Sequence, residues 1–277
     1  MPFKTILVHV NRARRCQAVL EPALDLARRH LAHVVGIYVR PGIQATLAAD
    51  TLFKANALGA EVAAEQQEAE EIAATFARMT ANQPFTAEWR AIEAPHSDLA
   101  AAVLEHAYAA DIVVSSQGDP DWDRSPILDF PERLMIESGR PVLVVPYVGN
   151  YREIGKNVVI AWKTGREAAR AVFDALPILE AARAVHILQI VEGRDELPKA
   201  EPAIAAALIR HGLKLDVRSY QAIDIDVGDE LLSRLADLGA DLLVMGAYGH
   251  SRLREYVFGG ATRHLSRHMT VPTLFSH

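Results

Sequence analysis

The pattern of apolar and polar positions occurs twice along the chain. Residues 4–10 and 156–162 are short runs rich in β-branched side chains, which is typical of strands buried on both faces. A pattern with helical period follows each run, over residues 18–30 and 166–179, with apolar side chains on one face. The two copies predict that the 277 residues contain an internal repeat.

The ends of the two copies match as well. Residues 111–116 correspond to 241–246, and residues 140–146 correspond to 270–275; all four runs are strand-like. Nearly equal spacing separates the last two runs in each copy. Repetition of this kind at both ends of each copy indicates that the repeat extends over whole domains.

Strand-like and helical segments alternate between these ends. Further strand-like runs lie at 34–39, 85–91, 184–190 and 215–220. Strands that alternate with helices predict a parallel, doubly wound sheet. We therefore expect an α/β protein with two Rossmann-like domains, residues 1–147 and 156–277, each a five-stranded parallel sheet with helices on both faces.

The first copy is longer because it contains an additional stretch between residues 41 and 81. Apolar positions of helical period there predict a long amphipathic helix. The acidic side chains on its polar side are interpreted as a solvated face: Glu65, Glu68, Glu70 and Glu71.

A glycine-containing loop follows the fourth strand of the second copy. Gly246 and Gly249 come first, and Gly259 and Gly260 precede a helix predicted over residues 262–268. Ligands of doubly wound sheets bind beyond the carboxyl ends of the strands. Gly249 would let backbone N–H groups approach a phosphate closely, and free N–H groups at the helix start favour an anion. The loop therefore predicts an anion site.

This spacing resembles a known nucleotide loop. Gly-x-x-Gly, nine residues and then Gly-[Ser/Thr] is similar to the loop of universal stress proteins, and strand order and spacing extend the resemblance over both halves. The resemblance implies a Rossmann-like fold; some members bind ATP or AMP, and others bind no nucleotide. By resemblance, the nucleotide-contacting positions are Met245, Gly246, Gly249, Gly259, Gly260, Ala261 and Thr262. Arg252 would add positive charge beside the phosphates.

Two positions depart from the family's pattern. Gly260 stands where the family has a hydroxyl side chain, and Lys163 stands where it usually has an acid after the first strand. A lysine cannot accept a hydrogen bond from ribose, but it would reach a phosphate. The alternative is that the glycines serve only a tight loop and helix packing.

The first copy lacks the glycine loop. Asp119 aligns with Gly249, and Asp129 falls near the position of Gly259. Carboxylates repel a phosphate, and three prolines in this stretch remove N–H donors. No nucleotide is expected there.

Composition narrows the function classes further. The formal charge of −6 argues against broad nucleic-acid binding, and no apolar run is long enough to predict a membrane span. Cys16 is the single cysteine and the N-terminus has no signal-peptide layout, which favours a cytoplasmic location. His264 and His268 have the spacing of a zinc pair but no third ligand, so no metal site is assigned.

The sequence therefore favours a cytoplasmic stress-response protein that binds ATP or AMP in its second domain as a regulator. No general base, metal pair or Walker lysine motif is placed, so no catalytic residue is assigned and turnover is expected to be slow or absent. A nucleotide-free interaction protein of the same family and a slow ATP hydrolase stay open as alternatives. The resemblance also predicts a pseudo-two-fold arrangement in which the last strands of the two domains pair antiparallel; further homodimerisation stays open.

Overall fold

Strands and helices alternate through the first half of the chain. The computed structural model describes residues 2–41, 55–94, 98–125, 129–193, 196–197, 202–248 and 261–277. The first half consists of β1 (Thr5–His9), α1 (Ala13–His30), β2 (His33–Pro41), α3 (Ala55–Thr80), β3 (Ala87–Ala94), α4 (Leu99–Ala107), β4 (Ile112–Ser116), α6 (Pro131–Glu137) and β5 (Val142–Val145). The long helix predicted between residues 41 and 81 is thus confirmed as α3.

The second half repeats this alternation. It consists of β6 (Asn157–Ala161), α7 (Arg166–Asp174), α8 (Leu176–Leu179), β7 (Ala184–Glu192), α9 (Ala203–Arg210), β8 (Leu215–Ala222), α10 (Val227–Asp237), β9 (Leu242–Gly246), α12 (Ala261–His268) and β10 (Thr273–Ser276). The single helix predicted over residues 166–179 is instead two, α7 and α8. Pro177, in the first turn of α8, lacks the N–H that a continuous helix would need.

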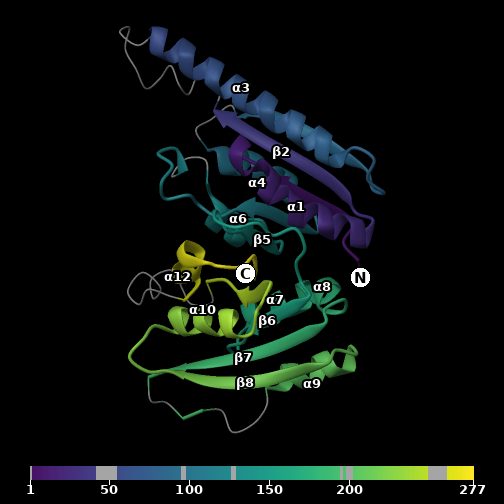
Figure 1. Cartoon of the computed structure of the whole chain (residues 1–277), viewed down its shortest axis with the longest axis vertical. Coiled ribbons are helices and arrows are strands. Elements are labelled where there is room, and N and C mark those ends of the chain that lie inside the picture. Colours follow the sequence, from purple (N-terminus) through teal and green to yellow (C-terminus); the bar gives the residue numbers. More distant parts are fainter. Residues whose placement is uncertain are drawn as a thin grey trace.

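The ten strands of the described residues lie in one sheet with a symmetric strand order. The order is β3-β2-β1-β4-β5-β10-β9-β6-β7-β8, so that the second half repeats the order of the first in reverse. Figure 1 shows the first half above the second, with β2 near the top and β8 near the bottom. Within each half all neighbouring strands are parallel. The α/β fold with five parallel strands in each half is therefore confirmed.

The two halves join through their last strands. β5 and β10 pair antiparallel, with Val144 opposite Thr273 and Val142 opposite Phe275. This confirms the predicted pairing and covers two edges that would otherwise expose unpaired backbone groups. It also turns two five-stranded sheets into one continuous mixed sheet.

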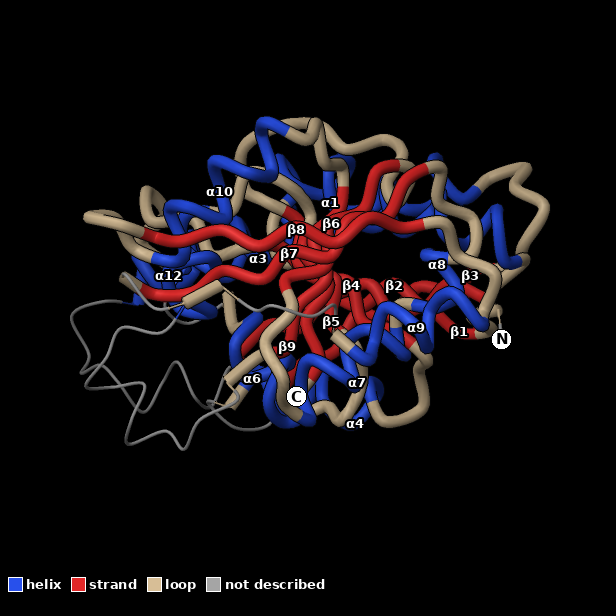
Figure 2. The backbone as a smooth tube through the Cα atoms, turned by 90° about the horizontal axis from the view of Figure 1, so that it is seen from below, coloured by secondary structure: helices blue, strands red, loops and turns tan. Residues whose placement is uncertain are grey.

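Helices cover both faces of this sheet, as Figure 2 shows. One core lies beneath α1, α3, α7, α8 and α9, and the other beneath α4, α6, α10 and α12. Each core contains side chains from both halves, for example Ile6 with Val158 in one and Leu7 with Val159 in the other. The halves are therefore packed as one body.

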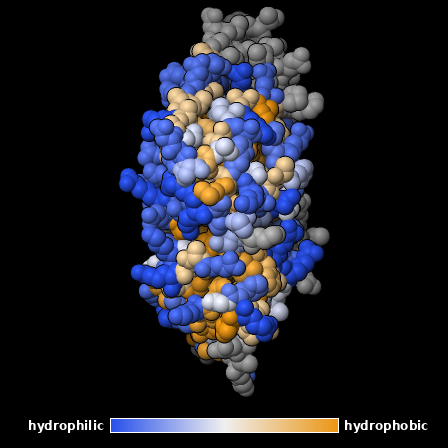
Figure 3. Space-filling model, turned by 90° about the vertical axis from the view of Figure 1, so that its right-hand side faces the viewer, coloured by the Kyte–Doolittle hydropathy of each residue, from blue (hydrophilic) through white to orange (hydrophobic). Residues whose placement is uncertain are grey.

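Apolar surface is unequally distributed between the halves. Figure 3 shows more of it over the lower part of the molecule, which is the second half. The large apolar side chains exposed in the described part of the second half are Phe173, Leu197, Ile209, Ile223 and Ile225. Leu31 and Tyr108 are those in the described part of the first half.

Candidate functional site

The carboxyl ends of β6 and β9 lie side by side in the second half. Ala161 pairs with Met245, so the exposed Lys163 follows β6 at the same end of the sheet where Gly246 ends β9. The structure thus brings Lys163, Met245 and Gly246 together at the end where doubly wound sheets bind ligands.

The start of α12 lies at the same end. The Tyr248 N–H donates to Thr262 Oγ1 at 3.4 Å, which joins the segment after β9 to the first turn of α12, begun by Ala261. Thr262 is buried. The remaining predicted nucleotide positions lie outside the described residues: Gly249, Arg252, Gly259 and Gly260.

Gly246 has a packing role. A Cβ at this position would lie 2.6 Å from the Ala168 nitrogen and 2.6 Å from the Glu167 carbonyl carbon. The start of α7 therefore approaches β9 as closely as only a glycine permits. Packing against a helix explains Gly246 without a ligand.

Glu167 lies against this glycine through its backbone carbonyl carbon and its Cβ, a contact that sequence reasoning missed. Its side chain is 10% exposed and pairs with Arg166. Burial acts to raise the pKa of the Glu167 carboxyl, but hydrogen bonds from Arg166 and the backbone hold that pKa below its ordinary value. Glu167 thus places an acid in the first turn of α7, four residues after Lys163, and its position in an amphipathic helix gave no signal of this contact.

Two buried polar atoms near the end of β6 have no partner. The backbone N–H of Trp162 donates to the Leu188 carbonyl oxygen at 2.8 Å, which continues the β6–β7 pairing and sets Trp162 beside Gln189. The Trp162 indole Nε1 and the Gln189 Oε1 are both buried and make no hydrogen bond to the described residues. An unmet donor thus lies on the strand next to an unmet acceptor, an arrangement that native proteins rarely leave without a partner.

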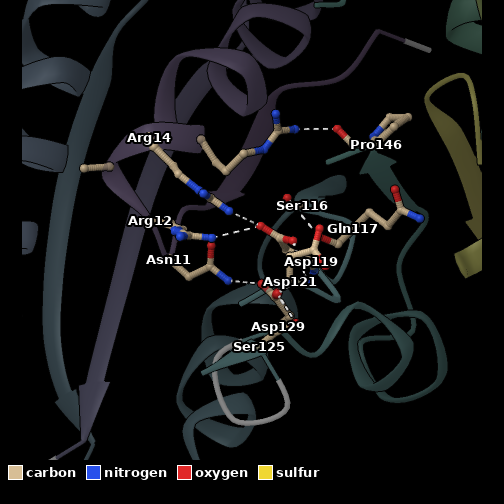
Figure 4. Close-up of polar contacts among 12 residues, drawn as sticks. Asn11, Arg12, Arg14, Ser116, Gln117, Asp119, Asp121, Ser125, Asp129 and Pro146 are labelled. Atoms are coloured by element: carbon tan, nitrogen blue, oxygen red, sulfur yellow. Dashed lines mark hydrogen bonds and ion pairs between the residues drawn. The ribbon is translucent and has the colours of Figure 1, made fainter. Parts of the chain in front are cut away.

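The corresponding end of the first half is filled by its own side chains. Asp119 Oδ2 pairs with Arg12 at 2.9 Å and also with Arg14 (Figure 4). The Arg12 guanidinium lies 4.6 Å from the ring centre of Trp122. The Asp119 side chain is only 8% exposed, so its carboxylate fills this end of the first half and pairs with both arginines.

Asp129 completes this arrangement. Its carboxylate accepts hydrogen bonds from Asn11 Nδ2, from Ser125 Oγ and, at 3.1 Å, from the Asp119 N–H (Figure 4). Burial raises the pKa of the Asp129 carboxyl. The acids predicted to fill this loop are therefore present, and they act as internal partners of nearby cations and N–H groups.

The acidic side of α3 was interpreted wrongly for two residues. Glu68 accepts a hydrogen bond from the Ala13 N–H, and Glu65, 12% exposed, pairs with Arg124. Glu68 satisfies a free amide at the start of α1, which explains why this helix begins at Ala13 rather than at residue 18. Sequence gave no signal of these contacts because helical period alone does not tell which charged side chains meet another element.

The histidine pair of α12 makes other contacts. His264 Nε2 lies 3.0 Å from Asp229 Oδ1, and the His264 and His268 rings are 4.6 Å apart. Among the described residues, no three metal-binding side chains come together. No described helix is both long and apolar enough to span a membrane.

Similar solved structures share this architecture over nearly the whole chain. A universal stress protein from Archaeoglobus fulgidus DSM 4304 has a TM-score of 0.76 at 15% identity, covering 98% of this chain and 95% of that one. A protein of unknown function from Pseudomonas aeruginosa PAO1 has a TM-score of 0.54 at 12% identity, covering 99% and 92%. The chain is thus a Rossmann-like α/β protein with the fold of a solved universal stress protein.

Sequence comparison adds the family. Residues 155–277 match the model of the universal stress protein family. Universal stress protein Slr1230 of Synechocystis sp. is 30% identical over 148 residues, which are 52% of this chain and 49% of that protein. The chain therefore spans about half the length of this curated relative. Residues 155–277 therefore resemble the domain of the universal stress protein family.

Proposed function

We propose that the chain is a tandem universal stress protein with two domains, residues 1–147 and 156–277. The second domain binds an adenine nucleotide, ATP or AMP, and acts in a cytoplasmic stress response as a regulator. The first domain holds its own carboxylates where the second would hold a ligand. The match of residues 155–277 to the family model, the glycine spacing and the geometry at the ends of β6 and β9 support this proposal.

Recognition of the adenine base is supported by the two buried side-chain atoms without a hydrogen-bond partner among the described residues, one just after β6 and one on β7. The Trp162 Nε1 is a donor and the Gln189 Oε1 an acceptor. Adenine presents an acceptor, N7, next to the donor N6–H₂. A base bound here would satisfy both protein groups, and satisfying buried polar groups is worth more than the same contact in water.

The phosphates would lie between the segment after β9 and the start of α12. The first N–H groups of a helix attract anions, and Thr262 stands in the first turn of α12. Lys163 is exposed at the same end of the sheet and would reach a phosphate, while Glu167 would accept a hydrogen bond from ribose. The departure from the family's pattern at Lys163 thus fits a modified form of the same site.

Regulation fits better than catalysis, because the described residues at this end of the sheet include no general base placed beside a nucleophile. A slow ATP hydrolase is the second candidate, and product formation separates it from a binding protein. A nucleotide-free interaction protein is the third, favoured by the packing role of Gly246.

Gentle extraction followed by mass analysis of the purified protein tests whether nucleotide is bound. A titration then separates base from phosphate recognition. Trp162→Phe keeps an aromatic ring but removes the N–H, so it should weaken AMP binding at least about fivefold and leave pyrophosphate binding unchanged. Trp122→Phe, in the first half, is the matched control. Equal AMP affinity in wild type and Trp162→Phe would contradict a position of the adenine base beside Trp162.

A further inference from the structure

A side chain of the first half is bound to the helix that opens the proposed nucleotide site. Gln117 follows β4 and is 1% exposed. Its Nε2 donates to the Ser266 carbonyl oxygen of α12 at 3.0 Å, and its Oε1 accepts from the Tyr147 N–H at 3.0 Å. Both ends of the amide are therefore used, and in Figure 4 the Gln117 side chain points away from Asp119.

The contact lies at the carboxyl end of α12, where carbonyl groups lack hydrogen-bond partners within the helix. The last four carbonyl groups of an α-helix have no partner within the helix, and Ser266 belongs to the last turn of Ala261–His268. Gln117 satisfies one of them from the other half of the chain. Since α12 is two turns long, a bond at its end also restrains the first turn, which carries Thr262.

The contact is made in one direction only. Ala247 is the counterpart of Gln117: each follows the fourth strand of its half, and each N–H donates to the last strand at 2.8 Å, to Ser276 and Val145 respectively. Alanine has no side-chain donor. The first half therefore holds the helix of the second, and the second does not return this bond.

The loop that carries Gln117 is itself fixed. Asp119, two residues further on, is held by Arg12 and Arg14, and its N–H donates to Asp129. If the loop after β4 had to open to bind a ligand of its own, Gln117 would move with it. The internal carboxylates keep it in place instead.

We propose that Gln117 is a positioning residue for α12 and thereby for the nucleotide site of the second half. This rests on the proposed function. Gln117 fixes the end of α12, so the first turn presents its N–H groups and Thr262 in one orientation toward the ligand. The first half thus acts as a built-in support for binding in the second.

The test combines hydrogen exchange of the α12 amides with AMP titration of the full chain. Gln117→Met has similar shape and neither donates nor accepts. Gln117→Glu still accepts from the Tyr147 N–H but presents a carboxylate to Ser266 O. Both variants lose the hydrogen bond to the Ser266 carbonyl oxygen, so both should speed exchange of the α12 amides and weaken AMP binding, each by at least about fivefold.

A matched control is available just after the end of α3. Gln83 Nε2 donates to the Met79 carbonyl oxygen at 3.0 Å, the same chemistry at a different helix end. Gln83→Met should change neither α12 exchange nor AMP affinity. Denaturant midpoints show whether each variant is folded.

Each outcome bears on one idea. Unchanged α12 exchange in a folded Gln117→Met or Gln117→Glu protein would overturn the positioning role, and so would faster exchange with unchanged AMP affinity. A wild-type protein without AMP affinity would overturn the proposed function, and the exchange measurement would still decide whether Gln117 holds α12.

Discussion

The backbone nitrogen of Ala168 lies where a side chain at Gly246 would have to go. A Cβ on Gly246 would stand 2.6 Å from that nitrogen, far inside the van der Waals contact distance. The obstacle is helix backbone rather than the flexible end of a side chain, so α7 and β9 would have to move apart. Gly246 is therefore required by packing, whatever the neighbouring loop binds.

Gly246→Ala should lower the free energy of unfolding by about 1–3 kcal/mol, the usual cost of overpacking a core. Urea unfolding without nucleotide measures it. Gly165→Ala is the control, because the nearest atom to its added Cβ lies at 3.5 Å and the backbone there is extended. That variant should stay within about 0.5 kcal/mol of wild type. Similar costs for both would contradict the packing explanation.

Asp111 and Asp241 bind the starts of β1 and β6, the central strand of each half. Asp241 accepts hydrogen bonds from three successive backbone N–H groups before and at the start of β6, at 2.9–3.1 Å. Asp111 accepts two, from Lys4 at 2.6 Å and Thr5 at 2.9 Å. The repeat thus conserves one acid in the same structural role within a single chain.

Asp241→Ala should destabilise the protein by about 2 kcal/mol, because several backbone donors lose a charged acceptor. Asp111→Ala should cost less, since it releases two donors instead of three. Chemical denaturation of both variants at pH 7 compares them. A larger loss for Asp111→Ala than for Asp241→Ala would show that the number of backbone bonds does not set the cost.

His9 predicts how stability depends on pH. It is buried at the end of β1 and stacked on Phe130, with ring centroids 4.7 Å apart. Burial lowers the pKa of its imidazole from 6.5 to about 4. The unfolded chain therefore takes up a proton near pH 6.5 that the folded chain refuses, so stability is full above pH 6.5 and is lost as the pH falls toward 4.

Between pH 7 and pH 5 this residue should cost about 2 kcal/mol of stability. His9→Gln removes the titrating group, so its unfolding free energy should fall by about 2 kcal/mol less than that of wild type over the same range. Urea unfolding at both pH values measures the difference. Equal losses in the two proteins would show that His9 is protonated without unfolding.

Repetition in the sequence was sufficient to predict the main chain of this fold. Buried β-branched runs marked the strands, and the family resemblance predicted how β5 and β10 meet. Helix boundaries were harder to predict from the sequence. The end of α7 depends on Pro177, and the start of α1 depends on a carboxylate of α3 that lies 55 residues away in sequence.

The site was predicted only in part for the same reason. Met245, Gly246 and Thr262 were predicted from the glycine spacing and the family resemblance that it carries, and all three lie at one end of the sheet. Glu167 and Gln117 could not be found in this way, because each acquires its role from a tertiary contact. Gln117 and Ser266 are 149 residues apart, and no local pattern in either stretch indicates the other.

Calorimetric titration of AMP into wild type and Gly249→Val tests the central claim most directly. Valine would put a branched Cβ where the backbone is proposed to approach the phosphate, so the variant should bind at least about tenfold more weakly, while wild type binds one AMP per chain. Equal affinity of the two proteins would contradict a phosphate site at this loop. Absence of measurable AMP or ATP binding to wild type would contradict nucleotide recognition by this chain.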